Sequence, residues 1–194
     1  MAYDPGAEIG RSLLSAIAGA TVDFSPLPAG DPGVANTLDA IVTTVRKSSR
    51  FPIVKDTAFL IVSGCRPARF TEYYEAIRNY LKGRFRYIPD TYGIEELTAP
   101  WIQCSRLRAT GICYGDCDDL AALSAALWRA CGGRAAVAAV ATGKRKTTAG
   151  PFGIRWPRPG LDHAIAEAWL GGRWLTMDTL YPSLKPLRKM RREV

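Results

Sequence analysis

Gly115-Asp116-Cys117-Asp118-Asp119-Leu120 opens the stretch that decides the fold, which runs on to Cys131 and ends at Gly132-Gly133. From Leu120 to Cys131 nearly every residue is apolar or small, so this stretch offers no wide polar face to water. The three aspartates supply capping oxygens and negative charge for a first helical turn, and the two glycines supply a left-handed stop. The sequence therefore predicts a helix buried in the core, with a cysteine at its entrance.

Cys117 would lie where backbone N–H groups point outward and the helix dipole favours negative charge, an arrangement that lowers the pKa of a thiol. The carboxylates of Asp118 and Asp119 oppose this effect, because nearby negative charge disfavours a thiolate. A cationic group must then offset them, and a protonated histidine is the usual candidate. The chain contains one histidine, His163.

His163 opens the first of two alternating runs that flank Gly171-Gly172, a pattern typical of a β-hairpin. If the two glycines form the loop, Trp169 pairs with Trp174, and the same register continues along both strands. His163 and Asp178 would then share a face as diagonal neighbours about 7 to 8 Å apart at the backbone, close enough for their side chains to meet. A four-residue loop keeps this register, whereas a three-residue loop would turn Asp178 to the other face.

These features in this order resemble the transglutaminase-like superfamily of papain-like cysteine enzymes: a cysteine that opens a helix after Gly-Asp, a histidine that opens a strand, and Trp-x-x-x-Asp-Thr on the next strand. They are most similar to small Gly-Asp-Cys-Asp-Asp proteins often found in bacteriophage genomes. The resemblance runs from about Lys55 to Pro182 and implies an α+β fold, with a buried catalytic helix packed on an antiparallel sheet. It also implies that Cys117 is the nucleophile, His163 the general base and acid, and Asp178 the residue that orients the imidazole.

A Cys-His-Asp set favours a cysteine-dependent acyl-transfer enzyme that acts on a protein or peptide, by amide hydrolysis or by transfer of the acyl group to an amine. The backbone N–H of Cys117 would supply one donor to the developing oxyanion. Gln103 or the indole N–H of Trp101 would supply a second. The alternative is that Trp101 fills the core and Gln103 is a surface amide.

Two aromatic residues are candidates for the substrate groove. Tyr114 would line the entrance to the nucleophile, unless it packs against the helix. Trp156 lies in the long basic loop 143–160 before the histidine, and loops of this length are commonly functional or mobile. Many relatives carry an aromatic residue where this chain has Ile165, so the groove is expected to differ in detail.

The composition limits the classes of protein that the chain can represent. It has 194 residues of which 47% are hydrophobic, enough for one substantial core, and no apolar run of about eighteen residues that would predict a membrane span. The acidic start is unlike a signal peptide. Five cysteines, an odd count, predict free thiols in a reducing compartment such as the cytoplasm. Because Cys104, Cys113, Cys117 and His163 miss the usual zinc-ligand spacing, neither a metal nor a cofactor is expected.

Three parts are predicted along the chain: an N-terminal arm with a Pro/Gly linker over 1–33, the transglutaminase-like domain over 34–183, and a basic tail over 184–194. The arm is interpreted either as a docking peptide or as a helix packed on the domain. Within the domain, apolar spacing predicts helices over 36–45, 54–63 and 71–82, the last of them ended by Gly83. Residues 134–142 suit a central strand, although their alanines suit a helix equally well.

The net charge of +8 is unevenly placed, because five of the last ten residues are lysine or arginine. This tail is interpreted as solvated and partly disordered, and the alternative is contact with phosphates or an acidic partner. Nucleic acid is not expected as a partner, because no known binding motif is present. A second hypothesis is a structural protein that keeps the fold and docks onto phage structural proteins in a virion through the arm and the tail; the phage association rests on the resemblance alone.

Overall fold

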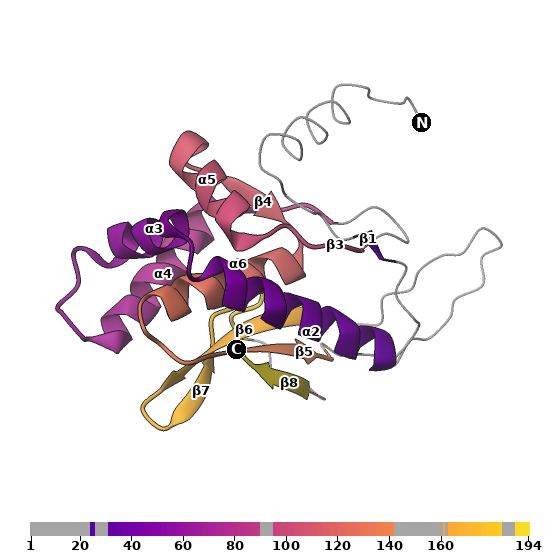
Figure 1. Cartoon of the computed structure of the whole chain (residues 1–194). Coiled ribbons are helices and arrows are strands. Elements are labelled where there is room, and N and C mark those ends of the chain that lie inside the picture. Colours follow the sequence, from indigo (N-terminus) through magenta and orange to yellow (C-terminus); the bar gives the residue numbers. More distant parts are fainter. Residues whose placement is uncertain (1–23, 26–30, 90–94, 142–160, 162, 184–188) are drawn as a thin grey trace.

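The computed structural model describes residues 24–25, 31–89, 95–141, 161, 163–183 and 189–194. Helices and strands are mixed along the chain, and a four-stranded sheet lies beneath a group of helices (Figure 1). The elements are β1 (Phe24–Ser25), α2 (Asp31–Ser48), α3 (Pro52–Val62), α4 (Phe70–Arg84), β2 (Phe85–Tyr87), β3 (Glu95–Glu96), α5 (Pro100–Thr110), β4 (Cys113–Gly115), α6 (Cys117–Ala130), β5 (Ala135–Val140), β6 (His163–Leu170), β7 (Arg173–Thr176) and β8 (Lys189–Glu193).

Helix α6 lies at the centre of the molecule, where it contacts helices α2 to α5 on its outer sides and strands β5 and β6 below it. Every residue from Leu120 to Trp128 is buried, and the indole of Trp128 donates to the carbonyl of Arg134 at 2.8 Å. Gly132 has a φ of 84° and ends the helix in the left-handed region. The predicted buried helix with its glycine stop is therefore confirmed.

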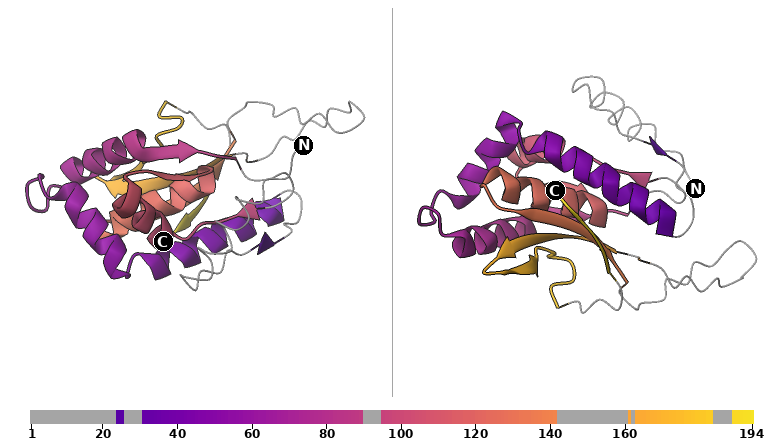
Figure 2. Two further views of the ribbon diagram at one scale, coloured as in Figure 1. Left: turned by 90° about the horizontal axis from the view of Figure 1, so that it is seen from above. Right: turned by 60° about the horizontal axis from the view of Figure 1, so that its bottom comes forward.

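The main sheet has the strand order β7-β6-β5-β8, and every neighbouring pair is antiparallel. Helix α6 packs on one face of it (Figure 2), where alternate residues of β5 and β6 such as Val137 and Ala166 join the core. The strand predicted over 134–142 is β5, which is buried along its whole length. It lies inside the sheet, between β6 and β8, so the prediction of a central strand is confirmed.

The β6–β7 hairpin has the predicted register, with Trp169 paired to Trp174. Gly171 and Gly172 form the two-residue loop with φ values of 59° and 80°, the backbone of a type I′ turn. The register continues one residue beyond β7, because the N–H of Met177 donates to the carbonyl of Ala166 at 2.8 Å. This hydrogen bond holds Met177 against β6, and Asp178 is the next residue, so its position relative to β6 is also restricted.

The predicted helices 36–45, 54–63 and 71–82 correspond to α2, α3 and α4, and their ends differ from the structure by one to five residues. Helix α2 begins at Asp31, so the last three residues of the predicted arm are helical, and Pro32 is tolerated because first-turn N–H groups have no intrahelical acceptor. Gly83 does not end α4, which continues to Arg84 and closes when the N–H of Phe85 donates to the carbonyl of Leu81. An interior glycine weakens a helix by only about 1 kcal/mol, which the packing of neighbouring residues offsets. The remainder of the arm, apart from β1, lies outside the described residues.

The interpretation of the basic tail as partly disordered is wrong for its described residues, although Lys189, Arg191 and Glu193 are exposed as the solvated tail predicts. Lys189–Glu193 forms β8 and pairs antiparallel with β5 at the edge of the main sheet. Lys189 and Arg191 both form ion pairs with Glu167, a buried carboxylate in β6. Two cations of the tail thus neutralise a buried carboxylate from the surface, because a buried carboxylate requires cationic partners.

Two small sheets complete the fold. Strand β1 pairs antiparallel with β3, and β2 pairs parallel with β4, which leads directly into α6. No helix among the described residues is long and apolar enough to cross a membrane.

Candidate active site

The entrance of α6 is held by a reciprocal capping box. Asp116 Oδ1 accepts the backbone N–H groups of Asp118 at 2.9 Å and of Asp119 at 3.3 Å, and Asp119 Oδ2 accepts the N–H of Asp116 at 3.4 Å. The other oxygen of Asp119 accepts the N–H of Thr98 at 2.6 Å, which ties the helix start to the segment before α5. Cys117 is thereby fixed as the first residue of the helix.

Gly115 is required by the same arrangement. A Cβ atom at this position would lie 1.9 Å from Asp119 Oδ2, so any other residue would push that carboxylate out of the capping box. The structure thus explains four positions of the Gly-Asp-Cys-Asp-Asp motif: Gly115 leaves the space, Asp116 and Asp119 form the cap, and Cys117 occupies the first helical position.

The thiol of Cys117 is partly exposed and donates to Asp118 Oδ1 at 3.5 Å. Burial raises the pKa of this thiol well above its usual range, and the carboxylates of Asp118 and Asp116 raise it further. A hydrogen bond from the backbone of Ala164 acts in the opposite direction. The pKa of the Cys117 thiol is therefore raised where a lowering was expected at the helix start, first because of burial and then because of the two acids.

His163 and Asp178 are in direct contact. The distance from His163 Nε2 to Asp178 Oδ2 is 2.8 Å, and the two side chains are only 5% and 2% exposed. Asp178 Oδ1 accepts the N–H of Leu180 at 2.8 Å, so both carboxylate oxygens are engaged and the carboxylate cannot rotate freely. The contact predicted from the hairpin register is confirmed.

The partner of Nε2 determines what Nδ1 can do. In a neutral imidazole, an Nε2–H that donates to Asp178 leaves Nδ1 as a proton acceptor. Ala164, the residue after His163, hydrogen bonds through its backbone to the sulfur of Cys117. The structure thus brings Cys117, His163 and Asp178 to one end of β6, although they are far apart in the sequence.

The two predicted oxyanion residues have other contacts. Gln103 in α5 is fully buried, and its Nε2 donates to the backbone carbonyl of Tyr114 at 2.8 Å, so it is not a surface amide. Its Oε1 is buried without a hydrogen-bond partner among the described residues. Trp101 stacks on Phe51 with ring centroids 5.9 Å apart and packs against the core. Gln103 braces β4, and Trp101 matches the core-filling alternative.

Of the two predicted groove residues, Tyr114 lies in the described part of the chain. Tyr114 is exposed in β4, three residues before Cys117, with the guanidinium of Arg106 over its ring at 4.4 Å from the centroid. Tyr87 at the end of the neighbouring strand β2 and Ile88 directly after it are also exposed. An exposed apolar surface therefore lies beside the strand that leads into α6. Trp156 lies outside the described residues.

Sequence reasoning missed Tyr181. Its ring packs against the imidazole of His163 at right angles, with centroids 4.9 Å apart. Tyr181 follows the end of the hairpin, in a turn where the alternation of strand residues no longer indicates which side chain faces which. The one signal in the sequence was its nearness to Asp178.

All five cysteines are free, as predicted. Cys104 and Cys113 are buried, and burial raises the pKa of each thiol to about 12. Within the part of the chain that the structure describes, the ligand-type atoms of Asp116, Cys117 and Asp118 lie within 4.8 Å of one another. Asp116 caps the helix, and Asp118 accepts a hydrogen bond from the thiol of Cys117. These local contacts of the helix start explain why the three groups lie close together.

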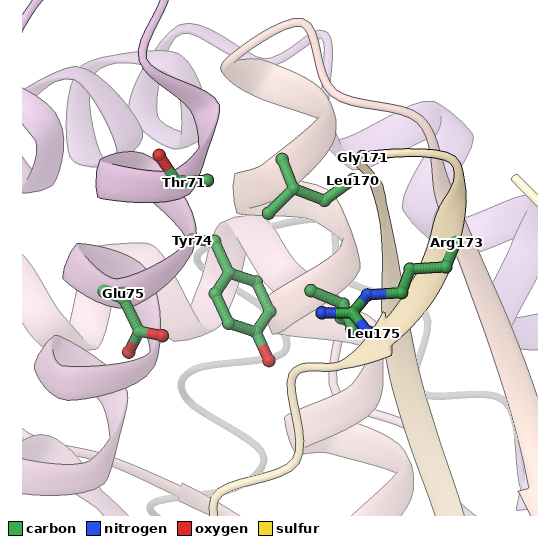
Figure 3. Close-up of a pocket in the computed structure, with 7 residues that line it drawn as sticks. All are labelled: Thr71, Tyr74, Glu75, Leu170, Gly171, Arg173 and Leu175. Carbon is green, nitrogen blue, oxygen red and sulfur yellow. The ribbon is translucent and has the colours of Figure 1, made fainter.

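A separate hollow of about 440 Å³ lies between α4 and the loop of the β6–β7 hairpin (Figure 3). Figure 3 shows the ring of Tyr74 directed from α4 toward the hairpin, where its hydroxyl donates to the carbonyl of Thr176 at 2.6 Å. The other lining residues are Thr71, Glu75, Leu170, Gly171, Arg173 and Leu175. The hollow lies at the loop end of β6, whereas His163 lies at the opposite end, so it is not part of the candidate active site.

Residues 55–179, more than half of the chain, match the family model of the transglutaminase-like superfamily. The chain belongs to this superfamily. The matched range includes Cys117, His163 and Asp178, and the predicted fold class, an α+β transglutaminase-like domain, is confirmed.

Two solved structures are similar to this transglutaminase-like chain. A candidate protease from Parabacteroides distasonis ATCC 8503 has a TM-score of 0.52 and 16% sequence identity, over 87% of this chain and 32% of the other. A candidate cysteine protease from Cytophaga hutchinsonii has a TM-score of 0.48 and 17% identity, over 85% of this chain and 54% of the other. The chain thus spans about a third and about half of these two proteins. At 16% identity the likeness to the first concerns the fold alone. No curated protein matches the chain.

Proposed function

We propose that this transglutaminase-like chain is a cysteine-dependent acyl-transfer enzyme that acts on an amide bond of a protein or peptide. One observation carries the proposal: Asp178 holds Nε2 of the only histidine in the chain at 2.8 Å, while the next residue of β6 contacts the sulfur of Cys117. In this proposal Cys117 is the nucleophile, His163 is the general base and then the general acid, and Asp178 orients the imidazole and stabilises its protonated form.

The raised pKa of Cys117 determines the order of the steps. Since the thiolate is disfavoured before substrate binds, Nδ1 of His163 takes the proton as the sulfur attacks the carbonyl carbon. The new C–S bond forms while the carbonyl π electrons move to oxygen. Collapse of this intermediate breaks the C–N bond, and the leaving amine takes the proton from Nδ1. Water or an amine then attacks the thioester and regenerates the thiol of Cys117.

The oxyanion would be stabilised first by the backbone N–H of Cys117, because N–H groups of the first helical turn have no intrahelical acceptor. The observed contacts of Gln103 and Trp101 favour bracing and packing for these two residues over a role as the second donor. Tyr114, with Tyr87 and Ile88 beside it, favours a substrate with an apolar segment next to the reacting amide.

The test of the proposal is iodoacetamide labelling read at each cysteine by mass spectrometry, in the wild type and in His163→Ala. We expect Cys117 to react faster than Cys65 and Cys131, which are also partly exposed, and to lose at least about tenfold in rate when His163 is replaced. The rates of Cys65 and Cys131 are the internal control and should not change. A rate at Cys117 that does not depend on His163 would mean that the catalytic pair does not exist.

A second measurement identifies the acyl acceptor. Incubation with glutamine-containing peptides and a fluorescent primary amine yields labelled peptide if an amine resolves the thioester, and cleaved or deamidated peptide if water does. Both products should disappear in Cys117→Ala.

The alternative function, a structural protein of a phage particle that docks through its arm and tail, has no support in the comparisons. The described part of the tail is already paired within the main sheet. Assembly of a particle that is unaffected by Cys117→Ala, with no thioester chemistry in the wild type, would favour this alternative.

A further inference from the structure

We propose that the hollow between α4 and the β6–β7 hairpin is a second binding site, which takes a small carboxylate attached to an apolar group. The site goes beyond the proposed acyl transfer, because it lies at the loop end of β6, whereas His163 opens that strand at its other end. Such a carboxylate occurs in free apolar acids and at the C terminus of a peptide whose last residue is apolar.

The hollow has the size of a ligand site and stable walls. Its volume of about 440 Å³ falls within the range of about 300 to 1,000 Å³ that small-molecule sites occupy. One wall is α4 and the other is the hairpin, and the hydroxyl of Tyr74 joins them by its hydrogen bond to the carbonyl of Thr176 at 2.6 Å. Since this bond holds the walls together before any ligand arrives, less ordering has to accompany binding.

Arg173 supplies a cation to the hollow. Figure 3 shows its side chain directed from the hairpin toward α4. Among the residues that the structure describes, no carboxylate lies within ion-pair distance of Arg173. Glu75, the acid on the α4 wall, pairs instead with Arg78 at 3.6 Å, so its charge is already compensated. An unpaired guanidinium offers a planar fork of N–H donors that fits a carboxylate.

Apolar groups lie beside this cation. Leu170 and Leu175 come from the hairpin and the ring of Tyr74 from α4 (Figure 3). Gly171, a central residue of the two-residue loop with a φ of 59°, lines the same hollow, and its N–H is a donor that the hairpin ladder does not use. The lining therefore favours a ligand that combines one negative charge with a short apolar body, because a bare anion would leave the apolar wall uncovered.

A titration of the full chain with N-acetyl-leucine, followed in a ¹H–¹⁵N NMR spectrum, tests the site. We expect shifts of the N–H signals of Thr71, Gly171 and Arg173, with a dissociation constant on the order of 1 mM, as is usual for a ligand of about a dozen heavy atoms. N-acetyl-leucinamide lacks the charge and N-acetylglycine lacks the apolar side chain, so each should bind at least about fivefold more weakly.

Three variants assign the binding to the hollow. Arg173→Gln should weaken the binding of N-acetyl-leucine at least about fivefold, because the guanidinium is lost. Arg84→Gln is the matched control and should change nothing, since Arg84 is an exposed arginine at the end of α4 that lies over the ring of Tyr80. Glu75→Gln removes a negative charge from the lining and should bind at least as tightly as the wild type. Thermal unfolding checks that each variant is folded, and Glu75→Gln and the two analogues still test the site should Arg173→Gln fail to fold.

Acetyl-Gly-Gly-Leu distinguishes the two sources of the carboxylate. Binding at least as tight as that of N-acetyl-leucine supports the site and assigns it to a peptide C terminus, whereas weaker binding supports it and assigns it to a free acid. Shifts confined to other parts of the chain, equal binding of N-acetyl-leucinamide, or unchanged binding in Arg173→Gln would overturn the inference. So would weaker binding in Glu75→Gln, since that result would assign the site to an ammonium group. The titration measures binding without turnover, so it decides this inference whether or not Cys117 is catalytic.

Discussion

Cys117 differs from the other thiols of the chain in what surrounds it. Burial is the main cause of the raised pKa of Cys117, as it is for Cys104 and Cys113, but Cys117 also has the carboxylates of Asp118 and Asp116 beside it. The environment of Cys117 therefore suits a nucleophile that is activated only when His163 accepts its proton.

Replacement of Asp118 should make Cys117 more reactive. Because the Asp118 carboxylate raises the pKa of the Cys117 thiol, Asp118→Asn should lower that pKa and increase the thiolate fraction at any pH below it. We expect iodoacetamide to label Cys117 about threefold to tenfold faster at pH 8, with the pH profile displaced to lower pH. Asp56→Asn, the same change at an exposed position of α3, is the control. A slower or unchanged rate would show that Asp118 does not govern this thiol.

The sequence supplied the residues of the candidate site but not their environments. Cys117 follows from the motif, and the contact of His163 with Asp178 follows from the hairpin register, because both depend on local periodicity. The raised pKa of Cys117, the burial of Gln103 and the packing of Tyr181 on His163 depend on which segments meet in space. No local pattern carries that information.

At the level of elements, one carboxylate, that of Asp119, makes two of the contacts that hold the start of α6. Asp119 accepts N–H groups from Asp116 and from Thr98, and it reaches both because Gly115 has no side chain. The capping box thus does more than begin the helix: the contact of Asp119 with Thr98 connects α6 to the segment before α5 and sets the position of Cys117. A distortion at Gly115 should therefore lower the free energy of unfolding and change the reactivity of the Cys117 thiol.

Gly115→Ala should therefore destabilise the protein. The new methyl group would displace the Asp119 carboxylate, and two backbone N–H groups would lose their acceptor. Loss of a cap and of a buried acceptor together predicts a decrease of about 2 to 4 kcal/mol in the free energy of unfolding, measured by urea denaturation. Gly83→Ala is a control with the opposite sign, because open space surrounds this helical glycine and alanine should stabilise it by about 0.5 to 1 kcal/mol. Equal effects at the two positions would contradict the role assigned to Gly115.

Element types were easier to predict than the pairing of elements. The glycines of the hairpin and the apolar spacing of α3 and α4 depend on residues close in sequence, and these predictions are confirmed. The alanines of β5 suit helix and strand alike, and its two partners, β6 and β8, are what hold it extended. One of those partners is the basic segment 189–193, whose own residues gave no sign of a strand.

At the level of the whole molecule, β8 connects the end of the chain to a carboxylate two strands away. Glu167 of β6 pairs with Ala136 of β5, and Ala138 of β5 pairs with Arg191 of β8. Because alanine is small, Arg191 reaches over β5 to Glu167, with Nε and Oε2 2.6 Å apart, and Lys189 reaches the other oxygen. The basic residues of β8 thus neutralise a buried acid, and the same strand forms one edge of the sheet.

Arg191 and Arg192 test this role, because they are the same residue type at adjacent positions of one strand. Arg191→Met would leave the buried Glu167 with a single cation, and we expect a loss of about 1.5 to 3 kcal/mol in the free energy of unfolding. Arg192 pairs at 3.1 Å with Asp39, which is exposed, so Arg192→Met should cost less than about 1 kcal/mol. Urea denaturation at low and high salt measures both, and only the smaller effect should be abolished by salt. If both variants lost a similar, small and salt-sensitive amount of unfolding free energy, both arginines would be solvated surface residues. Arg191 would then not stabilise the buried Glu167.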